Sequence, residues 1–177
     1  MSNSITIAID VMGSDKGPEE IISGVALSKE RNPESYYIFF GDKSVIENIV
    51  KKFSILDGSN EVINSEHVVS PDDKPSTVLR ESKNTSMGKS LEWLKNKKVD
   101  ALVSAGNTGA LMALSKFKLR TLNGISRPAI ATTIPHAKGE FIMLDLGANV
   151  ECSTENFIQF AIMGSEFAKI ILGKENP

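Results

Sequence analysis

The segment Ser104–Met112 carries small and polar residues in an order that suits the binding of an anion. It follows an apolar run at 99–103 and opens a helical pattern, so a buried strand is expected to pass into a helix here. A helix N-terminus presents unpaired N–H groups and partial positive charge, which attract anions. Gly106 and Gly109 let the backbone approach a ligand closely. Asn107 and Thr108, which lie between them, can cap the helix. Taken alone, the segment also fits an ordinary strand-to-helix turn.

Two further apolar strands end in polar or small residues. The run Ile5–Ile9 leads into Asp10–Gly17, and the run Phe141–Leu144 leads into Asp145–Asn149. In an open α/β sheet the carboxyl ends of parallel strands share one edge, and ligands bind at that edge. We therefore expect the three loops to converge on an anionic or phosphorylated ligand held largely by backbone N–H groups. The sequence contains neither a Walker motif nor a dinucleotide-binding glycine motif after its first strand.

Charged residues near these loops have both a functional and a structural interpretation. Arg80 and Lys83 lie about one helical turn apart and can add positive charge to the site, although two solvated bases give the same pattern. Asp10, Asp15 and Asp145 could ligate a divalent metal, but an aspartate at a strand end or turn is more often a cap.

Composition limits the class of protein. The chain has 177 residues, of which 41% are hydrophobic and 24% charged, as in globular domains. A net charge of -2 gives no basic excess for nucleic acid, and no apolar run approaches the roughly 20 residues of a membrane-spanning helix. The N-terminus lacks the features of a signal peptide, and the lone Cys152 suits a reducing cytosol. His67 and His136 lack the spacing of a zinc site, and we expect neither a metal nor a cofactor.

Strand-like and helix-like patterns alternate along the chain, which predicts an α/β fold with a mostly parallel sheet between helices. Short apolar runs predict strands near 5–9, 36–40, 61–63, 99–103, 129–134 and 141–144. Amphipathic patterns predict helices from Pro18, from a capping box at Ser44, from residue 76 with a break near Asn84, from residue 108 and from Ser153 or Thr154. We expect Phe117 and Phe157 on buried helix faces, and one domain over residues 1–177.

Several motifs together resemble the phosphate acyltransferase (PlsX) family of bacterial phospholipid synthesis. They are Asp10–Asp15 with Pro18, Ser104–Ala110, Arg127–Ala129, Leu144–Asn149 and Gln159–Gly164. The resemblance runs from about Ile5 to the end of the chain. Family chains are roughly twice as long, so we expect this chain to be the N-terminal portion of a longer acyltransferase.

The resemblance implies a fold and an activity. The fold is a three-layer αβα arrangement similar to phosphotransacetylases and isocitrate-dehydrogenase-like proteins. The implied reaction moves a fatty acyl group from the thioester of acyl carrier protein to inorganic phosphate. The acyl phosphate then serves a membrane glycerol-3-phosphate acyltransferase. Members resemble cytoplasmic homodimers that attach peripherally to the inner face of the membrane.

The resemblance also assigns roles to the candidate residues. Catalytic roles fall to Asn107, Lys83 and Asp145. The phosphate-binding set is Asp10, Gly13, Arg80, Ser104, Gly106, Thr108, Gly109, Gly147 and Asn149. Phosphate is already an oxyanion near neutral pH, so the step needs positioning and stabilisation of the carbonyl oxyanion more than a strong base.

Two other functions remain open at this stage. A phosphotransacylase that uses coenzyme A, or a dehydrogenase of similar fold, would share the strand-end loops. A shortened chain could also serve as an inactive dimerisation or scaffolding module. Because a complete cleft needs its other wall, residues 1–177 alone are expected to be weakly active or inactive.

Overall fold

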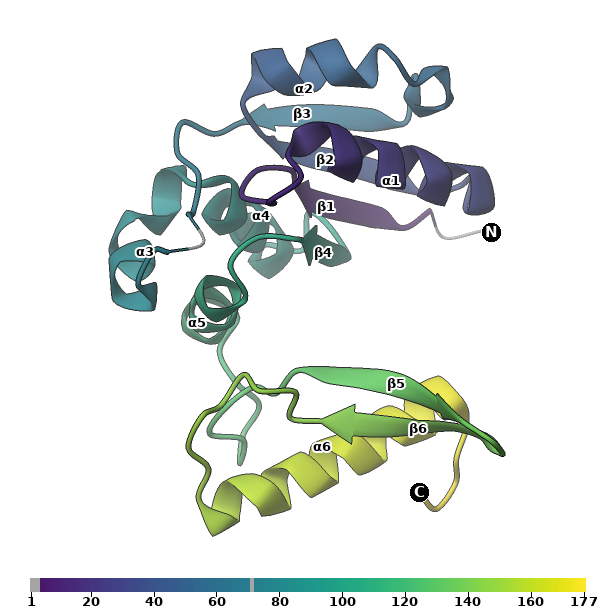
Figure 1. Cartoon of the computed structure of the whole chain (residues 1–177), viewed down its shortest axis with the longest axis vertical. Helices are drawn as coiled ribbons and strands as arrows, with labels where there is room; N and C mark the ends of the chain where they lie inside the picture. Colours follow the sequence, from purple (N-terminus) through teal and green to yellow (C-terminus); the bar gives the residue numbers. More distant parts are fainter. Residues whose placement is uncertain (1–3, 71) are drawn as a thin grey trace. The chain divides into compact units, whose positions relative to one another are not determined.

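The computed structural model describes residues 4–70 and 72–177. Its contacts divide the chain into two compact units, and the boundary along the sequence lies between Leu119 and Arg120. The first unit contains β1 (Thr6–Asp10), α1 (Pro18–Arg31), β2 (Tyr36–Gly41), α2 (Lys43–Val50), η1 (Ser54–Leu56), β3 (Asn60–Asn64), α3 (Pro75–Glu81), η2 (Ser82–Asn84), α4 (Ser86–Lys95), β4 (Ala101–Ser104) and α5 (Thr108–Leu119). The second contains β5 (Ala131–His136), β6 (Gly139–Leu144) and α6 (Thr154–Leu172) (Figure 1). The two units are described separately, and the expectation of one domain stays a prediction.

The first unit is built on a parallel sheet with the strand order β3-β2-β1-β4. Strand β1 lies between β2 and β4, with Asp10 level with Phe40 on one side and with Ser104 on the other. The chain loops that follow β1 and β4 therefore leave the sheet side by side. The predicted convergence is confirmed for these two loops, whereas the third loop belongs to the second unit.

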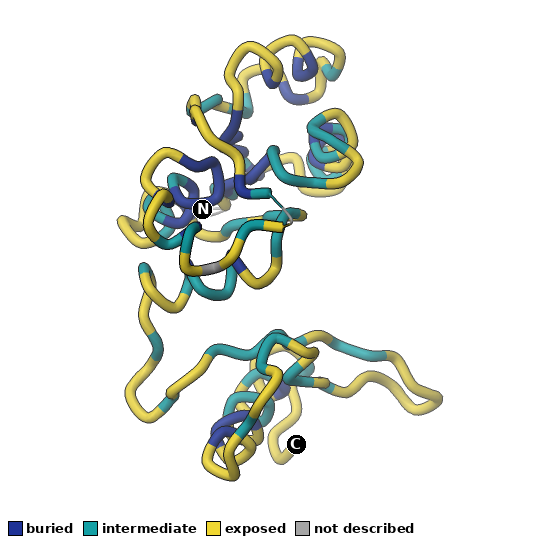
Figure 2. Tube along the Cα trace, turned by 60° about the vertical axis from the view of Figure 1, so that its left-hand side comes forward, coloured by how far each residue is buried: buried dark blue, intermediate teal, exposed yellow. Residues whose placement is uncertain are grey.

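Alternate side chains of the strands fill a core on each face of the sheet. Ile9, Tyr37 and Phe39 pack with the inner faces of α1 and α2. On the opposite face Ala8, Ile38 and Phe40 pack with residues of α4, and the ring of Phe40 meets the ring of Trp93 edge-on at 5.5 Å. This helix–sheet–helix layering confirms the three-layer α/β fold. Figure 2 shows the buried residues concentrated in this unit.

The helices around the candidate site begin and end close to where the sequence places them. The predicted break near Asn84 is the short helix η2, between the end of α3 at Glu81 and the start of α4 at Ser86. Thr85 caps α4, because its hydroxyl oxygen accepts a hydrogen bond from the N–H of Gly88 at 3.0 Å. The capping-box prediction at Ser44 is wrong, since the cap of α2 is Asp42, which accepts from the N–H of Ser44 and of Val45.

The second unit consists of the antiparallel β5–β6 hairpin and helix α6, which packs against β6. Ser153 caps α6 through a reciprocal hydrogen-bond pair with Asn156, as the sequence allowed. The predicted burial of two aromatic rings is wrong: Phe157 is 63% exposed, and Phe117 of α5 is 67% exposed. The β5–β6 hairpin covers only one side of α6. The apolar surface of the helix is wider than that side, so part of it, including Phe157, stays exposed. Within the described residues, no helix combines the length and apolarity needed to cross a membrane.

Gly88 tests the close packing of α4 against η2. A Cβ at this position would collide with the carbonyl of Ser82, so Gly88→Ala is expected to lower the free energy of unfolding by about 1–3 kcal/mol. Gly24→Ala in α1 is the matched control, because nothing lies within 4 Å of its added Cβ. It should raise the free energy of unfolding by about 0.5–1 kcal/mol. Urea denaturation measures the free energy of unfolding of the two variants. Equal changes in Gly88→Ala and Gly24→Ala would contradict the close packing of α4 against η2.

Candidate functional site

Asp10 lies at the carboxyl end of β1 and is almost completely buried, with 2% of its surface exposed. The hydroxyl of Ser104, at the end of β4, donates a hydrogen bond of 2.7 Å to its Oδ2. Oδ1 is buried and has no hydrogen-bond partner of ordinary geometry among the described residues. A buried carboxylate oxygen without a partner is costly, so burial disfavours the charged form of Asp10 relative to an exposed aspartate.

The electrostatics of Asp10 follow from this burial. Burial raises the pKa of the carboxyl above its ordinary value. The hydroxyls of Ser86 and Ser104 and the N–H of Met12 act in the opposite direction, but the pKa remains raised. Ser86 was not identified from the sequence. It opens α4, and only the packing of that helix on the sheet brings its hydroxyl towards the end of β1.

The turn from 104 to 109 connects this carboxylate to helix α5. The N–H of Gly106 donates to the hydroxyl oxygen of Ser104 at 3.2 Å, which fixes the first half of the turn. Asn107 caps α5: its Oδ1 accepts from the N–H of Ala110 at 2.9 Å, and its carbonyl accepts from the N–H of Leu111 at 3.0 Å. In the part of the chain that the structure describes, no hydrogen bond uses the N–H of Thr108 or of Gly109.

Asn107 also holds a neighbouring loop. Its side-chain amide donates to the carbonyl oxygens of Ser70 at 3.1 Å and of Asp73 at 3.3 Å. The sequence predicted a capping role for this residue, but gave no sign that the same amide would reach a loop more than thirty residues away. Its side chain is therefore a structural element of the site, while its predicted catalytic role stays a prediction.

Gly13 closes the site from the loop after β1. Its φ of 87° is in the left-handed region, and a Cβ there would lie 2.9 Å from the carbonyl oxygen of Val69. The same Cβ would lie 3.8 Å from the Cα of Gly106. A side chain at position 13 would therefore clash with the backbone of Val69, whereas its approach to the loop after β4 is an ordinary contact.

The predicted bases Arg80 and Lys83 are both exposed, at the end of α3 and in η2. Lys83 lines a cavity together with Lys89 and Lys118, and Arg80 does not line it. Their predicted contribution of positive charge to bound phosphate stays a prediction.

The third predicted loop is held together by Asp145. Its Oδ1 accepts from the N–H of Ile130 at 2.9 Å, and its Oδ2 accepts from the N–H of Asn149 at 2.8 Å and from the Asn149 amide at 3.1 Å. Burial tends to raise the pKa of Asp145, but these donors outweigh it and the pKa is lowered. The Asn149 amide also donates to the carbonyl of Pro128 at 2.9 Å. The carboxylate is ionised and shapes the loop, as the capping interpretation expects.

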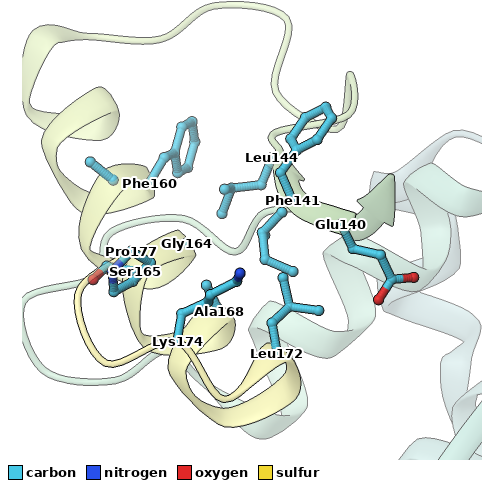
Figure 3. Close-up of a pocket in the computed structure, with 12 residues that line it drawn as sticks. Glu140, Phe141, Leu144, Phe160, Gly164, Ser165, Ala168, Leu172, Lys174 and Pro177 are labelled. Carbon is cyan, nitrogen blue, oxygen red and sulfur yellow. The ribbon is translucent and has the colours of Figure 1, made fainter. Parts of the chain in front are cut away.

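Cavities also occur in the second unit. Asp145, Gly147 and Asn149 line one of about 540 Å³, so the structure brings these three predicted residues together. Another, of about 440 Å³, is mostly apolar and lies between β6 and α6 (Figure 3). Phe160, Gly164 and Ala168 of α6 form one side of this second cavity. Among the described residues, no three His, Cys, Asp or Glu side chains are grouped as metal ligands.

Comparison with known proteins now identifies the family. A family model described as "Fatty acid synthesis protein" matches residues 5–177. The chain belongs to this family.

Curated relatives of this chain are named phosphate acyltransferase. The one from Paramagnetospirillum magneticum is 47% identical over 177 residues, covering 100% of this chain and 50% of the relative. The one from Rhodospirillum rubrum is 44% identical, and the match covers 100% of this chain and 51% of the relative. The chain thus spans about half the length of the curated relatives it matches, and the resemblance to phosphate acyltransferases is confirmed.

A solved structure of a phosphotransacetylase from Streptococcus pyogenes has a similar fold. Its TM-score is 0.67 at 18% identity, and the match covers 96% of this chain and 55% of the phosphotransacetylase chain. This confirms the predicted likeness to the phosphotransacetylase fold.

Replacing Asp10 with Asn is expected to remove a pH dependence of stability. Because burial raises the pKa of Asp10 above 3.8, the folded chain binds this proton more tightly than the unfolded chain. The free energy of unfolding of the wild type therefore falls as the pH rises from 3.8 towards the raised pKa. The fall amounts to about 1.4 kcal/mol for each pH unit by which the pKa is raised. Asp10→Asn keeps an acceptor for Ser104 without the titration.

Urea titrations between about pH 4 and 8 measure this difference. The stability of Asp10→Asn relative to the wild type should increase across the range. If the difference in free energy of unfolding between the wild type and Asp10→Asn stayed constant with pH, the Asp10 carboxyl would have the same pKa in the folded and the unfolded chain, and the prediction would be wrong.

Proposed function

We propose that the turn from 104 to 109 binds inorganic phosphate in a phosphate acyltransferase whose acyl donor is the thioester of acyl carrier protein. The observation that carries this proposal is the exposed N-terminus of α5, where the N–H groups of Thr108 and Gly109 have no partner among the described residues. Such groups are anion-binding donors. Membership of the fatty acid synthesis protein family and the name of the curated relatives support the reaction.

The reaction is a transfer of one acyl group. A phosphate oxygen attacks the thioester carbonyl carbon, and a new C–O bond forms. The C–S bond then breaks, and the thiolate of the carrier leaves and takes up a proton. The products are acyl phosphate and the free carrier thiol, which suits phospholipid synthesis through a downstream membrane acyltransferase. Phosphate needs no strong base for this attack, so holding the two reactants in place is the main requirement.

The residues of the turn divide this task. The N–H groups of Thr108 and Gly109, together with the positive end of α5, hold phosphate oxygens. Asp10 and Ser104 fix the start of the turn, and Asn107 fixes the cap and the adjoining loop. We assign Asp145, Gly147 and Asn149 to a second loop of the complete enzyme, shaped by the hydrogen bonds of the Asp145 carboxylate. Homodimer formation and peripheral membrane attachment are further parts of the proposal.

Thr108→Pro tests the role of a single N–H group. Proline is accepted in the first position of a helix, so the variant should remove one donor and leave α5 intact. Thr108→Ala is the matched control, because it keeps the N–H and loses only the side chain. Isothermal titration with inorganic phosphate should show about tenfold weaker binding for Thr108→Pro, and little change for Thr108→Ala. Equal affinities of the two variants would contradict the assignment.

The activity itself is tested by trapping acyl phosphate with hydroxylamine. The chain is assayed alone, and also joined to the second half of the relative from Paramagnetospirillum magneticum. Palmitoyl–acyl carrier protein and phosphate are the substrates. We expect product from the joined protein and little from the chain alone. Turnover with palmitoyl–coenzyme A but not with the carrier thioester would favour a phosphotransacylase that uses coenzyme A, and no product from either donor would contradict the proposal.

A further inference from the structure

Positive charge is concentrated in one part of the first unit. Residues 83–119 contain seven lysines and two acids, although the net charge of the whole chain is -2. This segment comprises the end of η2, helix α4, strand β4 and helix α5, and the two helices pack against each other. The rest of the chain carries a net negative charge, so the segment 83–119 differs from it in the sign of its net charge.

A cavity of about 490 Å³ lies within this cationic region. It is lined by Ile63, Lys83, Gly88, Lys89, Glu92, Trp93 and Lys118, which come from β3, η2, α4 and α5. Glu92 is the acid in this lining, and its Oε2 lies 3.1 Å from the Nζ of Lys118. The side chain of Lys118 is only 10% exposed, so this pair is part of the cavity wall.

The other two lysines of the lining keep their charge available for a ligand. Lys89 donates from Nζ to the carbonyl oxygen of Asn64 at 2.8 Å, which fixes its position but does not neutralise it. Lys83 is exposed at the rim. Since Glu92 is already matched by Lys118, the cavity has an excess positive charge at Lys83 and Lys89.

Trp93 gives the cavity a rigid aromatic wall. Its ring meets the fully buried Phe40 edge-on, with 5.5 Å between centroids. The Nζ of Lys98 lies 4.9 Å from the centre of the Trp93 ring, a cation–π arrangement. A fixed tryptophan is typical of the side chains that contribute most binding energy at a protein–protein interface, and the lysines beside it suit the polar rim of such an interface.

We propose that this cavity is a docking site for an acidic protein partner, which inserts an apolar side chain against Trp93 and places carboxylates on Lys83 and Lys89. A concave surface that includes an apolar wall and a glutamate suits a folded acidic protein. A nucleic acid requires an extended basic face, and the chain as a whole is acidic. A membrane surface is bound by protruding side chains rather than by a hollow.

The position of the cavity connects it with the phosphate site. Ser86, which faces Asp10, and Lys89, which lines the cavity, are three residues apart on α4, about 5 Å along the helix axis. A carrier docked on the cavity would therefore present its thioester close to the turn from 104 to 109. This identification of the partner with the acyl carrier protein rests on the proposed function.

The test measures binding separately from catalysis. Fluorescently labelled acyl carrier protein without an acyl group is titrated with the chain, and the anisotropy gives Kd. Lys89→Glu should weaken binding about tenfold, and Lys89→Gln should weaken it less. Lys51→Glu is the matched control, because it makes the same charge change at an exposed lysine at the end of α2 and should leave Kd unchanged. Circular dichroism verifies that the variants fold.

Each outcome decides the proposal. Loss of carrier binding in Lys89→Glu but not in Lys51→Glu supports it, even if acyl phosphate is never formed and the proposed function fails. Equal Kd values for the two Glu variants overturn it, even if the enzyme is active. It is also overturned if Lys89→Glu leaves carrier binding intact but abolishes binding of phosphatidylglycerol vesicles or single-stranded DNA.

Discussion

The hydrogen bond between Ser104 and Asp10 joins the ends of two parallel strands, and the candidate site is built outward from it. A carboxyl group in a nearly dry environment needs a donor, and the hydroxyl of Ser104 supplies it at 2.7 Å. The serine hydroxyl in turn accepts from the N–H of Gly106. The path of the backbone into α5 is therefore set by a short chain of polar contacts that begins with a buried acid.

The fold of the first unit could be predicted because its local patterns agree with its tertiary packing. The strand that begins near Ile5, the proline that opens α1 and the break near Asn84 each have a local cause. Two predictions failed for different reasons. Asp42 rather than Ser44 caps α2, and the apolar pattern of the helix does not distinguish between caps two residues apart. Phe117 and Phe157 continue apolar stripes of their helices, but the neighbouring elements do not reach far enough to cover them.

The site was predictable to the extent that strand ends determine it. The pairing of β1 with β4 brings Asp10 beside Ser104, and the glycine at position 13 lets the loop after β1 approach the backbone of Val69 closely. The contact of Ser86 with Asp10 could not be predicted, since it depends on how α4 packs on the sheet. The same holds for the cavity at Trp93, whose lining comes from four different elements. Family membership supports the proposed reaction, but does not locate these contacts.

Asn107 uses both ends of its amide, one to cap α5 and the other to hold the loop around Ser70 and Asp73. Such a side chain cannot rotate to follow an incoming ligand without releasing the helix or the loop. The N–H groups at the start of α5 are consequently oriented by folding, and the entropy of ordering them is lost during folding rather than during the binding of a ligand. For the proposed phosphate site, the backbone donors would therefore already be in place before phosphate binds.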